Sequence, residues 1–357
     1  MTSKNTDKPN QIYLSISQIA ILTGYSPYGS LIEMVLNLWS KVDKNSYNKK
    51  ILELENKFSK SFKSLSEWEK LSLISHELGL NDLKYKISNV MKNNSQHNLI
   101  ADQESLITQI KQIDQPTNSS MTTDQLESKK QILCKLVNSF TNRGYGSHNE
   151  KSAISVYKEI TNSDVIEQQN IVLARIQKAS NKNLNTEWFI KGKVDGVAIH
   201  NKDSKHTNHN KDTKDTKDTK DSKDTNDNKD TNDNKDNEKI LIEIKNRTKT
   251  LFGELKDYEK PQIQMYLKLM ELEKGHMVEH LKQDQSIQSQ SQTQHTNIIN
   301  VLYEPDYCNT LIERLKKFIK FFYNFIENQE MIELVLLNGS DDEDTEKYLR
   351  NKLNQYF

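Results

Sequence analysis

The chain contains two apolar, strand-like runs that carry charged residues, and a long low-complexity segment separates them. The first run is Lys193-Val-Asp195-Gly-Val-Ala-Ile199, and the second is Lys239-Ile-Leu-Ile-Glu243-Ile-Lys245. Side chains on a strand alternate between its two faces, so Glu243 and Lys245 are expected to share one face. An Asp on a neighbouring strand can meet them there. Two carboxylates and an ammonium at a strand pair predict a divalent-cation site of the kind used in phosphodiester cleavage.

The segment between the two runs, 201–238, repeats Lys, Asp, Thr and Asn and contains no aromatic or aliphatic residue. Such a segment cannot bury apolar surface, so it is expected to be disordered. Because loop length costs little entropy, we interpret it as an insertion in a hairpin that the two runs would otherwise form. Its positive and negative charges nearly balance, so it does not resemble a basic DNA-binding arm.

Composition limits the class of protein. A length of 357 residues, less the insertion, suits one large domain or one domain with a helical appendage. The formal net charge is zero, so any nucleic-acid surface must be a local one. Two cysteines, Cys134 and Cys308, are too few for a four-cysteine zinc or iron–sulfur site. The polar start and the absence of a long apolar run predict a soluble, intracellular protein with no membrane partner.

The pattern of apolar residues predicts an α/β fold in which helices flank a mixed central sheet. Residues 1–11 are expected to be disordered, 12–143 to form a helical N-terminal region, 144–330 to form the core, and 331–357 to form a C-terminal helical tail. In the first region, Ser15 or Ser17 is expected to cap a short helix that stops at Gly24. The expected core elements are a helix at 149–160, strands at 165–166, 171–176, 193–199, 239–245, 275–281 and 297–303, and helices at 261–272 and 305–328.

The order of these charged residues resembles the PD-(D/E)XK nuclease superfamily, and above all its YqaJ-like, lambda-exonuclease-type viral recombinase branch. The resemblance covers 12–40 and 144–330, so 41–143 is interpreted as a helical insertion. The matching pieces are Ser17-Gln-Ile-Ala-Ile-Leu-Thr-Gly24-Tyr-Ser-Pro-Tyr28, Gly146-Ser-His-Asn-Glu150, Gly192-Lys-Val-Asp195-Gly196, Glu243-Ile-Lys245 and the RecB-type pair Gln262 and Tyr266. Lys193-Val194 stands where that branch has Ser-Pro, which leaves the local turn geometry open.

The resemblance implies a restriction-endonuclease-like core and a role for each motif residue. Asp195 and Glu243 would bind Mg²⁺, for which Mn²⁺ would substitute, together with the backbone carbonyl of Ile244. Glu150 would complete the shell directly or through water. Lys245 would orient or deprotonate the attacking water and stabilise the charge of the transition state.

Further residues are candidates for contact with DNA. Gln262 and Tyr266 are one helical turn apart and face the same way, and the resemblance implies that they hold a substrate phosphate or brace Lys245. Ser17, near a helix N-terminus, would contact a DNA phosphate. Arg247 and Lys249 follow Lys245 with the same alternation, and each is interpreted either as a phosphate contact or as a solvated surface residue.

The function implied by the resemblance is a magnesium-dependent exodeoxyribonuclease. The first choice is a 5′-to-3′ exonuclease on linear double-stranded DNA in viral recombination, replication or repair, in the cytoplasm, viral factory or nucleus of an infected cell. Its partners would be DNA, further copies of the chain, and a single-strand annealing or helicase protein. The alternatives are a CRISPR-associated RecB-like nuclease without an iron–sulfur cluster, a catalytically dead DNA-binding adaptor, and a nuclease that acts on RNA.

Overall fold

The computed structural model describes residues 9–58, 67–92, 96–114, 121–166, 169–181, 184–200, 238–281, 295–340 and 342–357. The insertion at 201–237 and residues 1–8 of the expected disordered N-terminus lie outside the described residues, so those expectations stay predictions. The expectation of disorder fails at Asn10 and Gln11. They open strand β1 (Asn10–Ser15), where they pair with Thr186 and Glu187 of another strand.

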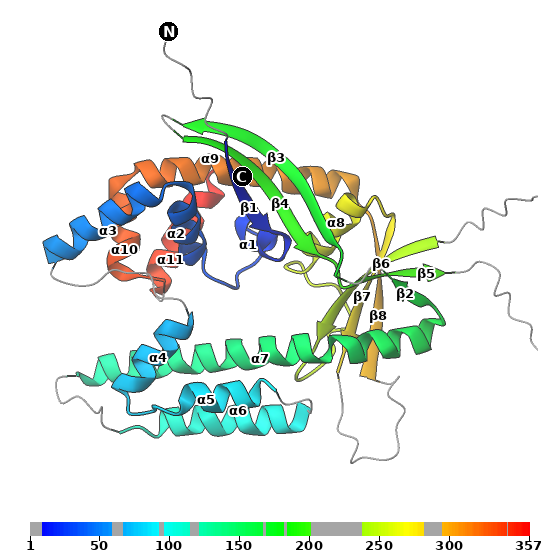
Figure 1. Ribbon diagram of the computed structural model, residues 1–357, viewed down its shortest axis with the longest axis horizontal. Helices are drawn as coiled ribbons and strands as arrows, with labels where there is room; N and C mark the ends of the chain where they lie inside the picture. The colour runs from blue at the N-terminus through cyan, green and yellow to red at the C-terminus, as the bar shows by residue number, and fades with distance from the viewer. Residues whose placement is uncertain are drawn as a thin grey trace, which may run out of the picture.

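A five-stranded mixed sheet lies at one end of the molecule (Figure 1). Neighbouring strands are antiparallel except β6 and β7, which are parallel and are joined by helix α8 (Lys260–Met270). His200 lies opposite Glu238, so the insertion leaves and re-enters the fold at adjacent strand ends. The strands lie in the order β2 (Asp164–Ile166), β5 (Gly196–His200), β6 (Glu238–Asn246), β7 (Lys274–His280) and β8 (Thr296–Leu302).

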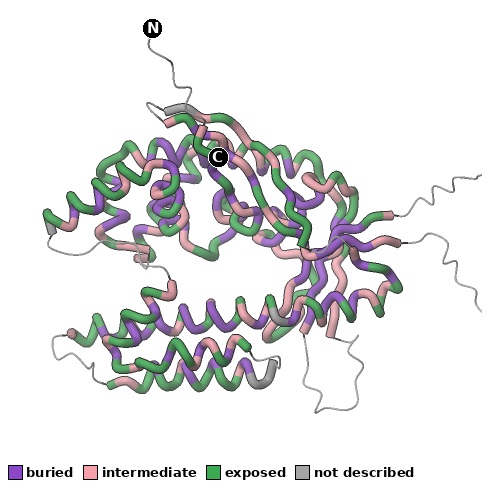
Figure 2. Tube along the Cα trace, in the orientation of Figure 1, coloured by how far each residue is buried: buried purple, intermediate pink, exposed green. Residues whose placement is uncertain are grey.

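Alternation along β6 gives this sheet two different covered faces. On one face, the isoleucines of β6 share an apolar cluster with Tyr157 of helix α7 (Thr123–Thr161). On the other face, Leu241 belongs to the main core together with Ile263 and Leu267 of α8. Figure 2 shows buried residues concentrated where these strands cross between the helices. Both faces of β6 are covered, and this burial explains why its sequence is a nearly continuous apolar run.

A second, three-stranded sheet has the order β1–β4–β3, with β4 (Leu184–Lys193) in the centre and β3 (Ile171–Asn181) antiparallel to it. Its inner face packs on helix α9 (Pro305–Glu327), where the ring of Trp188 lies 5.5 Å from the ring of Phe322. Trp188 is fully buried, and truncating such a side chain costs about 3–5 kcal/mol of stability. This sheet is therefore anchored to the main core through one face.

The structure corrects the strand predicted at 193–199. Strand β4 ends at Lys193 and strand β5 begins at Gly196, so Asp195 lies at a bend between two strands that belong to different sheets. Backbone hydrogen bonds between Val194 and the stretch Gln169–Asn170 hold this junction. The apolar alternation continues through the break, so the sequence pattern does not mark it.

The helical region contains α3 (Lys44–Phe58), α4 (Glu67–Glu77), α5 (Leu83–Val90), α6 (Gln96–Lys111) and the long α7. Helices α4 to α7 have an apolar core of their own, which includes Leu71, Leu99 and Leu133. Ile51 and Leu54 of α3 instead belong to the main core, so this separate core begins at α4 rather than at residue 41. Among the described helices, none is long and apolar enough to cross a membrane.

The helix predicted at 149–160 is the last part of α7, which runs without interruption from Thr123. Gly144 and Gly146 lie inside this helix and do not precede it. A Cβ on Gly144 would lie 2.8 Å from the Met91 side chain, so glycine here allows the chain after α5 to pack closely. The predicted helix start fails because glycine commonly ends helices, whereas packing retains it in this one.

The C-terminal region packs into the main core and is not a separate tail. Helices α10 (Gln329–Asn338) and α11 (Glu343–Asn354) contribute residues to the same cluster as α1 (Ile19–Leu22) and α2 (Leu31–Val42). The Glu346 carboxylate accepts from the backbone N–H groups of Leu31 and Ile32 at 2.8 and 3.1 Å. A side chain near the end of the sequence thus accepts hydrogen bonds from the first N–H groups of α2, which have no partner within the helix.

Candidate active site

Strand β6 places Glu243 and Lys245 on the face that α8 covers. The Lys245 Nζ atom lies 2.8 Å from Glu243 Oε1, in the same-face arrangement that strand alternation predicts. The Glu243 side chain is only 3% exposed, and that of Lys245 is 23% exposed. This ion pair is therefore largely shielded from water, and its charges interact more strongly than a surface pair.

Helix α8 adds Gln262 to this pair. Its Oε1 accepts from Lys245 Nζ at 3.0 Å, and its Nε2 donates to Glu243 Oε1 at 2.7 Å. Of the two roles expected for Gln262, the structure shows the bracing of Lys245. The amide thus fixes the ammonium and the carboxylate relative to each other.

Tyr266, one turn further along α8, has a different contact. Its hydroxyl donates to the backbone carbonyl of Lys193 at 2.7 Å. Tyr266 therefore holds the end of β4, two residues before Asp195. Burial raises the pKa of the Tyr266 hydroxyl. The hydroxyl therefore stays protonated and acts as a neutral hydrogen-bond donor.

Asp195 meets β6 at the point where β5 stops pairing with it. Its Oδ2 accepts from the Ile244 backbone N–H at 2.7 Å, immediately beyond the last β5–β6 pair, Gly196 and Ile242. The N–H and C=O of one strand residue point to the same edge, so the Ile244 carbonyl also faces this edge. The structure thus brings Asp195, Ile244 and Glu243 together from two segments that lie far apart in the sequence.

Glu150 approaches the same place from α7. Gln169 Nε2 donates to Glu150 Oε1 at 2.8 Å, and the charge of Glu150 is one of the causes that raise the pKa of Asp195. Nearby, Asn246 Nδ2 donates to the Gly146 carbonyl at 2.7 Å, which ties α7 to β6. The sequence carried no signal for Gln169 or Asn246, because their partners are distant along the chain.

Burial raises the pKa of Asp195 to about 7, and the charge of Glu150 adds to this effect against the hydrogen bond from Ile244. Burial also raises the pKa of Glu243 to about 7, although the Lys245 ammonium opposes it. The pKa of Lys245 is raised, because the attraction of Glu243 and Asp195 outweighs the burial that lowers it. The site therefore holds carboxylates that lack enough positive charge nearby.

The donor set fits a small, hard divalent cation. Glu243 Oε2 is buried and has no hydrogen-bond partner among the described residues. The described residues contain no group of three His, Cys, Asp or Glu side chains already arranged around one metal position, so the expected shell of Glu150, Asp195 and Glu243 is not preassembled. Mg²⁺ commonly uses one or two carboxylates and completes its shell with water and substrate phosphates. Asp195, Glu243 and the Ile244 carbonyl meet that requirement.

Of the residues expected to contact DNA, Ser17 and Lys249 are exposed, whereas Arg247 is largely buried. Ser17 is exposed in the 3-10 helix η1 (Ile16–Gln18), and its hydroxyl lies 2.7 Å from that of Ser15. Neither serine caps the helix as expected, since no side-chain cap bond forms there. Ser17 lines a pocket of about 430 Å³ together with Lys193 and Tyr266, and Lys249 is exposed in the loop after β6.

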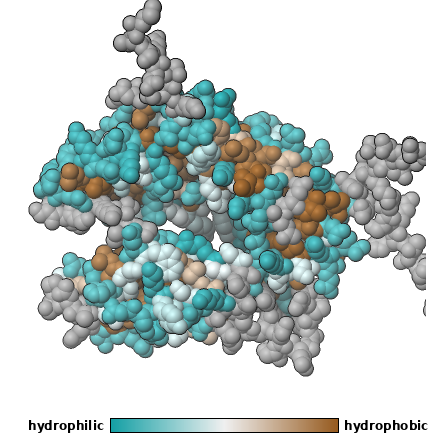
Figure 3. All heavy atoms as spheres, in the orientation of Figure 1, coloured by the Kyte–Doolittle hydropathy of each residue, from teal (hydrophilic) through white to brown (hydrophobic). Residues whose placement is uncertain are grey.

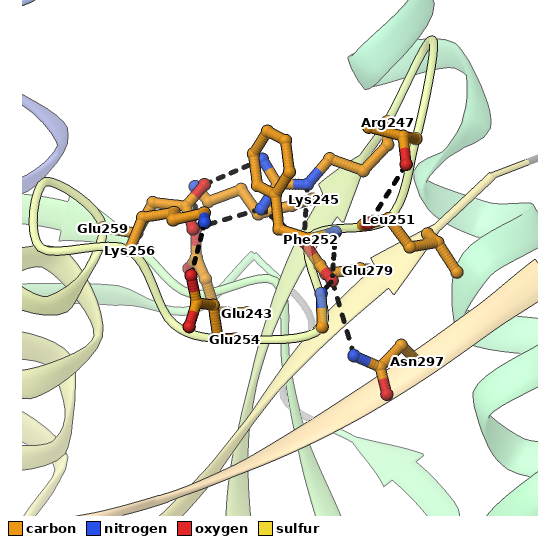
Figure 4. Close-up of polar contacts among 12 residues, drawn as sticks. Glu243, Lys245, Arg247, Leu251, Phe252, Glu254, Lys256, Glu259, Glu279 and Asn297 are labelled. Carbon is orange, nitrogen blue, oxygen red and sulfur yellow. Dashed lines mark hydrogen bonds and ion pairs between the residues drawn. The ribbon is translucent and has the colours of Figure 1, made fainter.

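Arg247 is held in a buried ion-pair network, which the sequence did not reveal. Its guanidinium donates to Glu259 at 2.8 and 3.1 Å and lies 2.7 Å from Glu279, a fully buried carboxylate (Figure 4). Glu279 also accepts from the backbone N–H groups of Phe252 and Gly253. Arg247 thus links the end of β6 to β7 and to the loop before α8. Its N–H groups are bonded to carboxylates, where a DNA phosphate would otherwise have to bind.

Comparisons with known proteins show only distant likeness. No family model matches the chain, and no curated protein matches it. A solved structure of an alkaline exonuclease, LHK-Exo, from Laribacter hongkongensis aligns with a TM-score of 0.30 and 13% identity, over 68% of this chain and 87% of that one.

Two other solved structures align similarly. LHK-Exo in complex with dAMP gives a TM-score of 0.29 at 13% identity, over 68% of this chain and 87% of that one. The protein SSO0001 gives 0.26 at 17% identity, over 67% and 83%. Superpositions this loose do not establish a shared fold or activity, so the site geometry has to carry the functional argument.

Proposed function

We propose that this protein is a metal-dependent deoxyribonuclease with a PD-(D/E)XK-type site. The observation that carries the proposal is the closed arrangement of Asp195, Glu243 and Lys245. The pKa values of Asp195 and Glu243 are both raised, and the buried Oε2 of Glu243 has no hydrogen-bond partner among the described residues. The Lys245 ammonium lies beside them, bonded to the other oxygen of Glu243. Such an arrangement suits a divalent cation and a phosphodiester together.

Each residue has a separable role in this proposal. Mg²⁺, or Mn²⁺ in its place, would polarise the scissile phosphate and lower the pKa of water. Asp195, Glu243 and the Ile244 carbonyl would hold the cation, and Glu150 would act on the shell through water. The raised pKa of Lys245 keeps it an ammonium at neutral pH, which favours stabilisation of phosphate charge over proton abstraction. Gln262 orients Lys245, and Tyr266 fixes the strand that leads to Asp195.

The finer proposal is a 5′-to-3′ exonuclease on linear double-stranded DNA in viral recombination, replication or repair. It rests on the sequence resemblance alone, as do assembly with further copies of the chain and a single-strand annealing or helicase partner. The dead adaptor is the less favoured candidate, because all three charged motif residues are present: Glu243 and Lys245 form an ion pair, and Asp195 is bonded to the Ile244 backbone between them. A CRISPR-associated nuclease would have to lack an iron–sulfur cluster, since the chain has only two cysteines, Cys134 against the core of α4 to α7 and Cys308 buried in α9.

The decisive experiment compares end-labelled linear and circular double-stranded DNA with Mg²⁺, using wild type, Asp195→Asn and Lys245→Met. Progressive loss of linear DNA only, abolished in both variants, would support the exonuclease and reveal its polarity. Nicking of circles would favour the endonuclease alternative. Binding without cleavage in either Mg²⁺ or Mn²⁺ would replace the proposal with the adaptor. Preferential cleavage of RNA in competition with DNA of equal length would favour the ribonuclease.

A further inference from the structure

The outer face of the three-stranded sheet carries an exposed tyrosine, a half-buried phenylalanine and several cations. Strand alternation places Trp188 and Ile190 of β4 in the core and leaves Phe189 and Lys191 on the opposite side. In Figure 1 this sheet lies in front of α9, so its outer face is turned toward the viewer. We use "outer face" for the outward residues of β1, β4 and β3, which include Tyr13, Phe189, Lys191, Lys193, Leu173 and Arg175.

The register aligns the aromatic residues into one row across the sheet. Tyr13 of β1 lies opposite Phe189 of β4, which lies opposite Arg175 of β3. The rings of Tyr13 and Phe189 are stacked, with centroids 5.5 Å apart and planes 26° apart. Tyr13 is 43% exposed, and Lys191 Nζ lies 5.7 Å from the centre of its ring. An exposed tyrosine ring stacked on a half-buried phenylalanine and flanked by cations is a surface on which nucleic-acid bases can stack.

The charges on this face are mostly positive. Arg175, Lys178, Lys191 and Lys193 point outward, and Glu187 is the one acidic residue that the described strands place among them. The Glu187 carboxylate lies 3.1 Å from Lys178 and 3.7 Å from Arg175. Lys191 and Lys193 are exposed. Since the whole chain has no net charge, this positive excess is a local property of the outer face.

The outer face also leads directly to the candidate active site. Tyr13, Lys191 and Lys193 line the same pocket as Tyr266, whose hydroxyl bonds to the Lys193 carbonyl. Asp195 follows two residues later. Beside this path, Leu173 is 53% exposed, and Figure 3 shows a hydrophobic patch over the β3–β4 part of the surface. A polynucleotide lying on the outer face would therefore have one end at the carboxylates.

We infer that the outer face binds single-stranded DNA and guides that strand to the candidate active site. The inference deepens the proposed function and rests on it. Bases stack on Tyr13 and Phe189, while phosphates contact Lys191, Lys193 and Arg175. Stacking on aromatic rings tolerates any base, so binding is expected to be insensitive to sequence. A second copy of this chain fits less well, because two positively charged faces repel each other.

The test measures binding of fluorescent oligothymidylate by anisotropy, with EDTA present and in an Asp195→Asn background, so that cleavage does not interfere. Tyr13→Ala should weaken binding by roughly 5- to 100-fold, and Tyr13→Phe, which keeps the ring, should restore it. Lys191→Glu should weaken binding and reduce the slope of log affinity against log salt by about 0.7 per lost phosphate contact.

Helix α11 offers a matched control. Tyr348 is 38% exposed, and Lys352 Nζ lies 5.5 Å from the centre of its ring, which reproduces the tyrosine–lysine pair at a distant place. Tyr348→Ala and Lys352→Glu should bind as the background does. Equal binding by the outer-face and α11 variants would overturn the inference. So would concentration-dependent dimers in sedimentation that disappear with Tyr13→Ala, because the occupant would then be a second copy.

A cleavage assay with Mg²⁺, in the chain that keeps Asp195, separates failure of this inference from failure of the proposed function. Metal-dependent cleavage with binding indifferent to Tyr13 and Lys191 would reject the outer face and keep the nuclease. Binding that depends on Tyr13 and Lys191 without any cleavage would keep the outer face and reject the nuclease.

Discussion

The carboxylate of Asp195 accepts a 2.7 Å hydrogen bond from the backbone N–H of Ile244, which lies 49 positions further along the chain. This bond fixes the Asp195 side chain against the edge of β6, directly beyond the end of β5. It places one carboxylate beside the strand that carries Glu243 and Lys245. The geometry of the site thus depends on the junction between the two sheets.

Asp195→Asn is expected to reduce cleavage roughly 100-fold or more while preserving the fold. Asparagine keeps an oxygen that can accept from Ile244 but removes the charge that a cation requires. Since burial already raises the pKa of Asp195 to about 7, the melting temperature in EDTA should stay constant or rise. Asp164→Asn, at an exposed position on β2, is the control and should leave activity unchanged. Activity above about a tenth of wild type in Asp195→Asn would contradict the assignment.

The stabilising effect of Mg²⁺ is expected to grow with pH. Asp195 and Glu243 have pKa values raised to about 7, against about 4 in an unfolded chain. The folded chain therefore holds more protons between these values, so in EDTA its free energy of unfolding falls as pH rises through this window. A bound cation relieves that penalty only where the carboxylates are charged.

Thermal unfolding with and without Mg²⁺ checks this pH dependence. The rise in melting temperature should be small near pH 5 and largest near pH 8, the two sides of the titration window. NaCl at equal ionic strength serves as the control, and Asp195→Asn should lose most of the effect. A shift that is equal at both pH values would mean that the cation binds elsewhere.

Gly192→Ala is expected to damage the site from outside it. A Cβ at this position would lie 2.7 Å from Cε1 of Tyr266 and 2.8 Å from Cδ1 of Ile16, and both side chains are buried. Such overpacking typically costs about 1–3 kcal/mol, and displacement of Tyr266 should release the Lys193 carbonyl and lower activity. Urea unfolding and cleavage rates measure the two effects.

Gly146→Ala is the matched control, and its expected effect on stability has the opposite sign. A Cβ there meets nothing within 4 Å, and the residue lies inside α7. Alanine in a helix interior should stabilise the chain by about 0.5–1 kcal/mol. If Gly192→Ala is as well tolerated as Gly146→Ala, the close packing of Tyr266 against β4 is not required.

Arg247→Met is expected to destabilise the protein by about 3–5 kcal/mol, because it removes the positive charge that pairs with two buried carboxylates. The side chains of Glu279 and Glu259 are 0% and 5% exposed. Lys249→Met, at an exposed position, should change stability by less than about 0.5 kcal/mol and act on DNA affinity instead. A stable Arg247→Met variant with weakened DNA binding would restore the phosphate contact that the sequence suggested.

Replacement of 202–237 by Asn-Gly is expected to leave activity and stability largely unchanged. His200 and Glu238 already lie opposite each other on antiparallel strands, and Asn-Gly favours the tight turns that join such strands. Circular dichroism establishes folding, and the cleavage assay measures function. A folded but inactive deletion variant would show that the insertion contributes to catalysis or substrate binding.

The local parts of the site could be predicted because each follows from the geometry of a single element. Glu243 and Lys245 share a face since strand residues alternate, and Gln262 and Tyr266 lie one turn apart since a helix repeats every 3.6 residues. The resemblance added the aspartate and glutamate of distant segments, and the structure brings both close to β6. The boundaries of β6, β7, β8, α8 and α9 also lie within two residues of the expected ones, whereas those expected at 149–160, 171–176 and 193–199 do not hold.

Other features depend on contacts that no local pattern records. The break that places Asp195 between two sheets, the pairing of β1 with β4, and the unbroken course of α7 through Gly144 are all decided by packing against distant segments. The sequence leaves Arg247 open between a phosphate contact and a solvated residue, yet its guanidinium is paired with Glu259 and Glu279, which come from other elements. The sequence by itself determined which charged residues could form a cation site. Tertiary structure alone decided which of them meet, because long-range packing, rather than local periodicity, sets the distances between elements.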